Sequence, residues 1–382
     1  MLDATRGPNV ELLGEPASRQ RLGTPCLVLD LARFERNIAA LQAHAARHGY
    51  ALRPVAKIHK SSAVARRQMA AGAIGQTCAT LVEAEVMVDA GIPGVLLFSP
   101  VVTAPKIARL IALNARAEGF LVAVDSPTQV DALAAANRDS GHRLHLLVDC
   151  EVGGGRTGVA DPAAAVAVAR RIAAQTPVLG FAGVQAYCGT IQAIPDYETR
   201  VGAAYRVAMR TRAYVDALRE AGLPPTIVSG GGTGTFDIDP RFGVYTECQA
   251  GSYLFMDAHY LDVSLQSDAA VPFEPALFVR SSVISNAQTG FCITDAGRKE
   301  FARDGLAPRP WHGAPQSARY AIVGDDLGRI DFADPSQQLP LGAAVECVPP
   351  HAYATLNLYP IYHCVRGDML VDLWPIDARS TW

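Results

Sequence analysis

The chain has 382 residues, of which 49% are hydrophobic and 19% are charged, and its formal net charge is −3. This composition indicates a globular protein and excludes a disordered one. Because 382 residues exceed the size at which a single core usually stops growing, we expect one large domain and a smaller one. The weak net charge gives no electrostatic reason to expect nucleic acid or an anionic membrane as a partner.

The amino terminus and the cysteines bear on the cellular compartment. Residues 1–23 lack the basic start, apolar core and small-residue cleavage site of a signal peptide, and no apolar run could span a bilayer. Six cysteines stand singly within apolar runs and show no CxxC spacing: Cys26, Cys78, Cys150, Cys188, Cys248 and Cys292. They are typical of reduced core residues rather than of disulfides or zinc ligands, so we expect a cytoplasmic protein.

From residue 24 onwards, apolar runs rich in β-formers alternate with segments of helical period. The predicted helices include residues 32–48, 61–71, 81–90, 103–117, 161–174 and 196–221. The predicted strands are residues 25–31, 51–57, 74–80, 95–100, 120–126, 144–151, 178–188, 226–229 and 247–251. Continuous apolar runs are typical of strands buried on both faces, so the pattern predicts a parallel sheet covered by helices. Eight or nine such units fit a closed (β/α)8 barrel, and one of the nine runs, by our interpretation the first, must lie outside it.

The texture of the sequence changes after about residue 262, where prolines and glycines become more frequent and helical periodicity fades. Short β-rich runs follow at residues 276–284, 291–295, 318–323, 343–348 and 369–374. They predict an antiparallel β domain. We therefore assign residues 24–262 to the barrel and 263–382 to a C-terminal β domain, and we leave open whether residues 1–23 pack on the latter.

Lys57 stands at the polar end of the predicted strand 51–57, directly before a helical segment that Ser61 and Ser62 open. In parallel α/β proteins chemistry is concentrated at this end of the strands, and a lysine shielded from water there can lose its proton and attack a carbonyl. The competing interpretation is an ordinary solvated lysine. The residues that share the same face decide between the two.

Several other unusual residues also follow predicted strands. Arg156 follows one strand and Tyr187 ends another, while glycine-rich segments at residues 229–234 and 249–253 follow the last two. Glycine-rich turns let backbone N–H groups approach a phosphate closely, and the last two strands are the usual phosphate position in a barrel. A lysine, a cation, an aromatic wall and a phosphate cradle on one face are what pyridoxal phosphate requires, so we predict that cofactor.

Seven segments of the chain resemble the group of D-threonine aldolase and 3-hydroxy-D-aspartate aldolase, relatives of eukaryotic-type D-serine dehydratase in the alanine-racemase-like fold-type III class. They are residues 24–30, 53–60, 155–159, 183–187, 229–234, 243–247 and 251–257. The resemblance continues to the end of the chain, where residues 371–375 and 378–379 also match. It implies a pyridoxal phosphate enzyme that forms a homodimer and acts on a small β-hydroxy amino acid.

The resemblance also implies a role for each matched residue. Lys57 corresponds to the Schiff-base lysine, Arg156 to the arginine near the phenolic oxygen, and Tyr187 to the residue against the pyridine ring. Comparison with the racemases places Gln249 near the ring nitrogen, where a neutral partner would leave the pyridine unprotonated. The residues that match the phosphate-binding loops are Gly231, Gly232, Thr233, Gly251, Ser252 and Tyr253.

The C-terminal domain departs from the group, which presents His-x-Asp, or His-x-Cys in the dehydratases, to a divalent metal. Here His351 is present and Tyr353 takes the second position. A phenol oxygen is a poor ligand for manganese, magnesium or zinc unless it is ionised, so we expect a weaker or different metal dependence, with His351 as the candidate ligand. Two neighbouring signatures also differ from the group. Val55 replaces the histidine of an Arg-Pro-His-Ala-Lys pattern, and an Asp-Glu-His-Gly pattern reads Asp325-Asp326-Leu327-Gly328.

The activity that the resemblance implies is cleavage of the Cα–Cβ bond of a β-hydroxy D-amino acid, giving an amino acid such as glycine and an aldehyde. Lys57, His351 and Tyr353 are then the candidate catalytic residues. Two alternatives share every cofactor residue: a dehydratase, in which Lys57 removes the α-proton, and a racemase with Tyr353 as the opposing acid. A third alternative is a cofactor carrier without catalysis, against which the full second domain and His351 argue.

Overall fold

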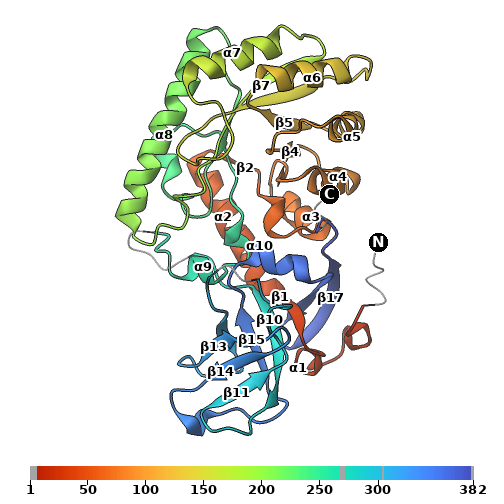
Figure 1. Ribbon diagram of the computed structural model, residues 1–382, viewed down its shortest axis with the longest axis vertical. Helices are drawn as coiled ribbons and strands as arrows, with labels where there is room; N and C mark the ends of the chain where they lie inside the picture. The colour runs from red at the N-terminus through yellow and green to blue at the C-terminus, as the bar shows by residue number, and fades with distance from the viewer. Residues whose placement is uncertain (1–6, 267–271, 303–304, 380–382) are drawn as a thin grey trace.

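The computed structural model describes residues 7–266, 272–302 and 305–379. Figure 1 shows an α/β part stacked on an elongated β part. Among the described residues no helix is long and apolar enough to cross a membrane. The domain boundaries 24–262 and 263–382 stay a prediction, and residues 1–6, 267–271, 303–304 and 380–382 within or before them lie outside the described residues.

The α/β part is built on an eight-stranded sheet whose strands run in the order β2-β9-β8-β7-β6-β5-β4-β3, and its neighbouring strands pair in parallel. The strands are β2 (Ala51–Leu52), β3 (Thr77–Cys78), β4 (Leu96–Leu97), β5 (Leu121–Val124), β6 (Leu144–Asp149), β7 (Leu179–Ala186), β8 (Ile227–Gly230) and β9 (Glu247–Cys248). A parallel bridge between Val55 and Thr77 joins the two ends of the sheet. The predicted (β/α)8 barrel is confirmed.

Seven helices cover the outside of this barrel: α2 (Leu31–His48), α3 (Ser62–Ala70), α4 (Leu81–Asp89), α5 (Ala104–Asn114), α6 (Pro127–Asn137), α7 (Pro162–Ala173) and α8 (Tyr197–Glu220). Their starts follow from local chemistry, since the side chains of Asp161 and Asp196 each accept a hydrogen bond from a backbone N–H of the first turn. Helix α6 is missing from the predicted set because alanines on its outer faces obscure the apolar stripe that contains Val130 and Leu133.

The β part is a nine-stranded sheet in the order β13-β14-β11-β10-β1-β16-β17, with β15 pairing to β10 and β12. Its strands are β1 (Cys26–Asp30), β10 (Leu277–Ser285), β11 (Phe291–Thr294), β12 (Arg309–His312), β13 (Arg319–Ile322), β14 (Gly328–Asp331), β15 (Ala344–Val348), β16 (Ile361–Arg366) and β17 (Met369–Pro375). All its pairings are antiparallel except that of β1 with β16. The predicted antiparallel domain is therefore confirmed.

The amino-terminal strand β1 belongs to this second sheet, where it lies between β10 and β16. β1 corresponds to the first of the nine predicted strands. The expectation that the first strand lies outside the barrel is therefore confirmed. The segment before it contacts the same sheet: Leu22 packs with Val28 and Phe278, and Arg19 forms an ion pair of 2.6 Å with Glu346. The two sheets therefore divide the chain differently at its start from the predicted boundary at residue 24.

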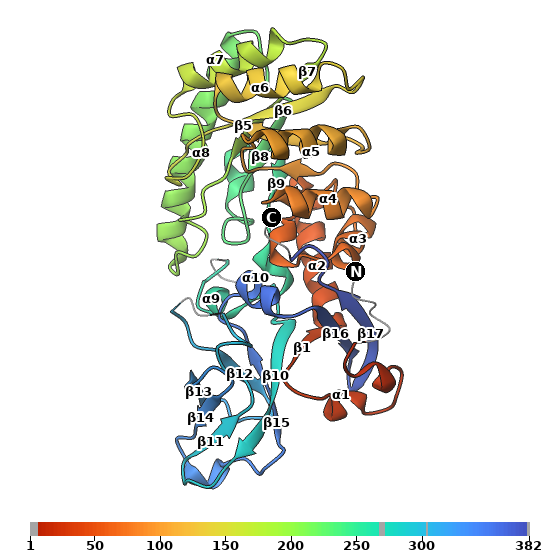
Figure 2. The ribbon, with the colours of Figure 1, turned by 45° about the vertical axis from the view of Figure 1, so that its right-hand side comes forward.

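The two parts meet along the residues that follow β2. The carbonyl oxygen of His59 accepts a hydrogen bond of 2.5 Å from the hydroxyl of Tyr362, and that of Lys60 accepts one of 2.9 Å from the backbone of Ala378. The backbone N–H of Ser62 donates to the carboxylate of Asp377 at 2.9 Å. Figure 2 shows the short helix α10 (Ala352–Thr355) in the region where the two parts meet. Residues from the far end of the chain thus lie beside the predicted lysine.

A buried ion pair holds β2 against β9. The guanidinium of Arg53 donates to both carboxylate oxygens of Glu247 at 2.8 Å, and the two side chains are 5% and 3% exposed. Such a pair contributes little over a well-packed apolar pair, but removing one partner leaves a buried charge without compensation. The interaction is therefore a sensitive point of the barrel.

We predict that Glu247→Leu lowers the free energy of unfolding by about 3–5 kcal/mol, because it leaves the Arg53 guanidinium buried and unpaired. Urea denaturation followed by circular dichroism measures this loss. Asp89→Asn is the matched control, since it breaks an ion pair with Arg116 whose two side chains are exposed, and it should leave the midpoint unchanged. Equal effects of the two substitutions would contradict the prediction.

Candidate active site

A cavity of about 280 Å³ lies at the mouth of the barrel, where the carboxyl ends of its strands meet the second domain. Ten of the twelve residues predicted for the site line it: Lys57, Arg156, Tyr187, Gly232, Thr233, Gln249, Gly251, Ser252, His351 and Tyr353. The other two, Gly231 and Tyr253, lie behind the lining. The cavity thus brings the predicted cofactor residues together with the two residues expected on the reaction side.

Lys57 lies in the short 3-10 helix η3 (Ala56–Ile58), which continues the chain from β2, and its half-buried side chain lines the cavity. Burial lowers the pKa of the Lys57 amine, the positive charge of Arg156 lowers it further, and the carboxylate of Glu83 opposes the change. A lowered pKa increases the fraction of neutral amine, which is the form that attacks a carbonyl. This environment favours the reactive lysine over the solvated one.

The two glycine-rich segments present unused backbone donors to the cavity. Among the described residues no hydrogen bond uses the N–H groups of Thr233, Gly251 or Ser252, and all three residues line the cavity. The N–H of Gly232 instead donates to the hydroxyl of Thr235 at 3.2 Å, and that of Tyr253 donates to the hydroxyl of Thr233 at 3.0 Å. Three backbone N–H groups around one cavity, without a hydrogen-bond partner in the part of the chain that the structure describes, could bind an anion such as a phosphate.

The glycines of the first segment are required by close packing. A Cβ at Gly232 would lie 2.6 Å from the side-chain oxygen of Gln192, and one at Gly234 would lie 1.8 Å from the Gln192 carbonyl oxygen. Gly231 has a φ of +67°, in the left-handed region that glycine adopts without strain. Gly231 therefore shapes the turn and does not itself line the cavity.

An aromatic side chain and a cation form one wall of the cavity. Tyr187 follows β7, and the guanidinium carbon of Arg156 lies 5.1 Å from the centre of its ring. Phe98, which follows β4, lines the same cavity. Aromatic faces of this kind can stack on a planar heterocycle. Gln249, which follows β9, is 4% exposed and also lines the cavity.

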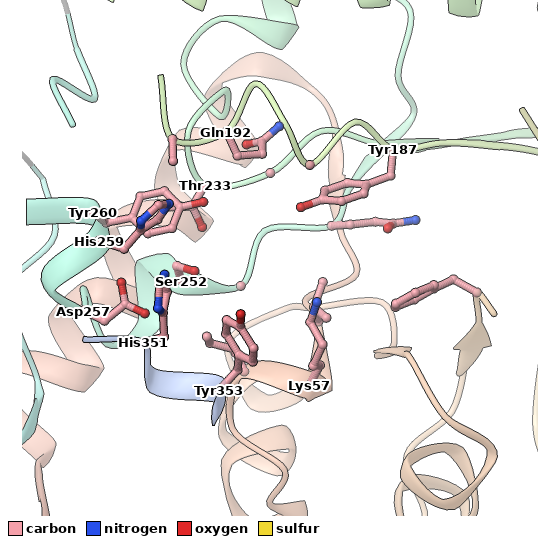
Figure 3. Close-up of a pocket in the computed structure, with 18 of the residues that line it drawn as sticks. Lys57, Tyr187, Gln192, Thr233, Ser252, Asp257, His259, Tyr260, His351 and Tyr353 are labelled. Atoms are coloured by element: carbon pink, nitrogen blue, oxygen red, sulfur yellow. The ribbon is translucent and has the colours of Figure 1, made fainter. Parts of the chain in front are cut away.

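The side of the cavity nearest the second domain holds two imidazoles and a phenol, side chains whose chemistry allows proton transfer. The rings of His259 and His351 are 4.7 Å apart, and the ring of Tyr353 is 5.7 Å from that of His351. The amine of Lys57 lies 5.5 Å from the centre of the Tyr353 ring. Figure 3 shows Lys57 and Tyr353 side by side below Tyr187, with the two histidines further along the cavity. This arrangement can accept and return protons next to a group held by Lys57.

Hydrogen bonds with Asp257 and Lys60 hold the helix α10, which carries Tyr353. The backbone N–H of Ala352 donates to the carboxylate of Asp257 at 2.8 Å. The amine of Lys60 donates to the carbonyl oxygen of Tyr353 and to the side-chain oxygen of Asn357, both at 2.7 Å. Residues of the barrel part thus hold α10 in place, and the amine of Lys60 is engaged in hydrogen bonds to Tyr353 and Asn357.

Asp257 and His259 are residues of the cavity that sequence reasoning missed. They follow η5 (Ser252–Leu254), the turn next to the second glycine segment, and His259 lies in α9 (Ala258–Leu261). Because they come only a few residues after the predicted phosphate segment, their position in the sequence could have identified them as candidates. What the sequence does not contain is that α9 and α10 meet, which brings His259 to His351.

The side chains present do not fit the divalent metal that the resemblance implies. Within the described ranges no group of three His, Cys, Asp or Glu residues is placed to hold an ion. Tyr353 offers a phenol where an anionic carboxylate would suit a hard cation. Residues 325–328 also differ from the group. They lie at the turn that leads into β14, and they do not line the cavity. The metal dependence stays a prediction.

Comparison with known proteins agrees with this arrangement. The sequence profile of the family "Alanine racemase, N-terminal domain" matches residues 29–259, and that of the "Putative serine dehydratase domain" matches residues 276–365. A D-threonine aldolase of Arthrobacter sp. is 38% identical, covering 96% of this chain and 95% of that protein. A 3-hydroxy-D-aspartate aldolase of Paracoccus denitrificans is 34% identical, covering 94% and 92%.

The fold agrees as well. The crystal structure of D-threonine aldolase from Filomicrobium marinum superposes with a TM-score of 0.89 at 38% identity, covering 94% of this chain and 96% of that one. The predicted resemblance is therefore confirmed over nearly the whole length of both chains. The chain belongs to the alanine-racemase-like family, in the group that contains D-threonine aldolase and 3-hydroxy-D-aspartate aldolase.

Proposed function

We propose that this protein is a pyridoxal phosphate-dependent lyase that cleaves the Cα–Cβ bond of β-hydroxy D-amino acids into an amino acid such as glycine and an aldehyde. One observation carries the proposal: a lysine with a lowered pKa shares a single cavity with two imidazoles supplied from the far side of the site. The two aldolases that resemble the chain at 38% and 34% identity support the same reaction.

The residues of the cavity fit the cofactor. Lys57 supplies the amine for its carbonyl carbon, and the unused N–H groups of Thr233, Gly251 and Ser252 supply a cradle for its phosphate. Tyr187 offers a face for the ring. We propose that Arg156 lies near the phenolic oxygen of the cofactor and Gln249 near its ring nitrogen, since both residues line the cavity. When bound, pyridoxal phosphate withdraws the electron pair that the broken Cα–Cβ bond leaves behind.

The protein must also move a proton, because the β-hydroxyl oxygen becomes the carbonyl oxygen of the aldehyde. We assign the removal of that hydroxyl proton to the imidazole of His351, with His259 beside it at a ring distance of 4.7 Å. Tyr353 lies between this pair and Lys57, within 5.7 Å and 5.5 Å of them. The amine of Lys57 lines the same cavity and would return a proton to Cα.

A dehydratase is the second candidate, because residues 276–365 match the profile of a putative serine dehydratase domain. In that reaction Lys57 would remove the α-proton and the reaction-side groups would protonate the leaving hydroxyl. Both reactions use the same cavity, so the products distinguish them.

We also propose that the protein is a cytoplasmic homodimer. All eight cysteines are free and buried, which suits a reducing compartment. Leu306, Trp311 and Leu327 are 40%, 38% and 41% exposed on the β domain, where a second copy would cover them.

For the holoenzyme with D-threonine, we predict glycine and acetaldehyde as the main products, because the chain resembles two aldolases at 38% and 34% identity. Aldehyde is measured with a coupled dehydrogenase, and amino acids by chiral chromatography. D-serine and 3-hydroxyaspartate complete the substrate series, and L-threonine is the stereochemical control. A 2-oxo acid with ammonia as the main product would favour the dehydratase instead, and equal turnover of L-threonine would contradict the D-specific proposal.

We predict that Lys57→Ala abolishes the fixation of cofactor by borohydride, since Lys57 alone of the buried amines lines the cavity among the described residues. Lys60→Ala is a stringent control. Burial lowers the pKa of Lys60 to about 8, yet its amine is directed to Tyr353 and Asn357 and not to the cavity. Mass spectrometry of the reduced protein should find cofactor fixed in Lys60→Ala and none in Lys57→Ala. The opposite result would move the assignment to Lys60.

We predict that a chelator leaves substantial activity, because His351 and the phenol of Tyr353 do not suit a hard divalent ion. Initial rates before and after dialysis against a chelator measure the effect. Tyr353→Phe should lower turnover by up to about 100-fold if the phenol transfers protons. Tyr353→Asp should instead introduce activation by manganese. Complete loss of activity on chelation, with full recovery on adding manganese to the unmodified protein, would show that this interpretation of the site is wrong.

A further inference from the structure

Gln249 presents one defined face of its amide to the cavity. Its side-chain nitrogen donates to the hydroxyl of Ser229 at 2.8 Å and to the side-chain oxygen of Gln185 at 3.3 Å. An amide nitrogen carries two hydrogens and accepts none, so both hydrogens are used within the protein. The side-chain oxygen Oε1 is therefore the polar atom that Gln249 has left for a ligand.

Buried hydrogen-bond partners determine which of the two terminal atoms of the Gln249 amide is the oxygen and which is the nitrogen. The side-chain nitrogen of Gln185 donates to a carboxylate oxygen of Asp149 at 3.1 Å and to the carbonyl oxygen of Phe98 at 3.5 Å. A carbonyl oxygen can only accept, so Gln185 must direct its nitrogen to this side and its oxygen to Gln249.

The whole chain of partners is shielded from water. Asp149, Gln185 and Gln249 are 5%, 1% and 4% exposed. The second carboxylate oxygen of Asp149 accepts a hydrogen bond of 2.6 Å from the hydroxyl of Thr157. Strands β6, β7 and β9 thus align one carboxylate and two amides toward the cavity, in a region where reversing an amide would leave buried groups unpaired.

The ligand atom that meets Gln249 must therefore be a hydrogen-bond donor. This step rests on the proposed function, since it takes pyridoxal phosphate as the ligand. The phosphate and phenolic oxygens of the cofactor attract donors and cations, which Thr233, Ser252 and Arg156 supply, and its carbonyl carbon belongs to Lys57. The remaining polar atom is the ring nitrogen, which donates only when it carries a proton.

We propose that Gln249 Oε1 accepts a hydrogen bond from the protonated ring nitrogen of bound pyridoxal phosphate, and that Asp149 and Gln185 are positioning residues that hold the amide in this orientation. The type of residue alone led to the opposite expectation, an unprotonated pyridine. A protonated ring withdraws electrons more strongly. Burial raises the pKa of the Asp149 carboxyl, but hydrogen bonds from Thr157 and Gln185 oppose this change, and an ionised Asp149 two amides away favours the positive charge on the ring.

The protonation state is measured directly on the native holoenzyme. Reconstituted with cofactor labelled with ¹⁵N at the ring nitrogen, it should give a ¹⁵N resonance in the range of a protonated pyridine. The 1-deaza analogue, which has no ring nitrogen, should bind roughly 10- to 100-fold more weakly than pyridoxal phosphate, as expected for a hydrogen bond to a charged group. An unprotonated resonance, or equal affinity for the two, would overturn the proposal.

Variants test the residues. Gln249→Leu should move the resonance to the unprotonated range and remove the preference for pyridoxal phosphate over the deaza analogue, while Gln249→Glu should keep the proton on the ring. Gln185→Leu removes the acceptor that orients Gln249 and should reduce the same preference by about tenfold. An unchanged resonance and preference in Gln249→Leu and Gln185→Leu would overturn the proposal.

Gln192→Leu is the matched control, since Gln192 also lines the cavity but its side chain binds Gly234 and Thr235 in the phosphate segment. It should weaken pyridoxal phosphate and the deaza analogue equally and leave the resonance of the ring nitrogen unchanged. If Gln192→Leu changed the ring-nitrogen resonance as much as Gln185→Leu does, the change would reflect a general disturbance of the cavity. That result would overturn the positioning role of Gln185. Fixation of cofactor at Lys57 by borohydride is scored separately, so failure of the proposed function is distinguishable from failure of this inference.

Discussion

The site depends on keeping one amine out of water. Burial lowers the pKa of Lys57, and the ring of Tyr353, from the second domain, lies with its centre 5.5 Å from the amine. The turn after Lys57 is also bound to the other domain at successive residues: Tyr362 donates to His59, and Ala378 to Lys60. Lys60 adopts a φ of +50°, an uncommon conformation for a side chain with a Cβ, which these contacts hold in place.

The two halves of the site are supported in different ways. The residues that we assign to the cofactor lie in the segments that follow β2, β6, β7, β8 and β9, so the sheet anchors these segments. The reaction side comes from α9 and α10, helices of four residues each, which loops position through contacts such as that of Ala352 with Asp257. We therefore expect substitutions on the second half to alter the chemistry more than the binding of the cofactor.

The sequence predicted the parts of the structure that rest on strong local patterns. Lys57 and the glycine segments could be found because strand ends in a barrel share one face, and the excess run was found because nine runs do not fit eight places. The position of β1 between β10 and β16 could not be derived, because its apolar residues suit either sheet. His351 and Tyr353 were identified only through the resemblance. His259 was missed because its contact with His351 joins residues 92 positions apart in the chain.

The orientation of Gln249 shows most clearly what a sequence leaves open. Glutamine carries a donor and an acceptor, and Gln185 and Asp149, on neighbouring strands, select which one faces the cavity. The choice matters because charge develops on the cofactor and on the hydroxyl oxygen in the same step. A metal ion would stabilise the second, whereas a protonated ring would stabilise the first. With Tyr353 in place of an anionic ligand, the network behind Gln249 gives this protein a way to lower the barrier through the ring, since both effects reduce the energy of one transition state.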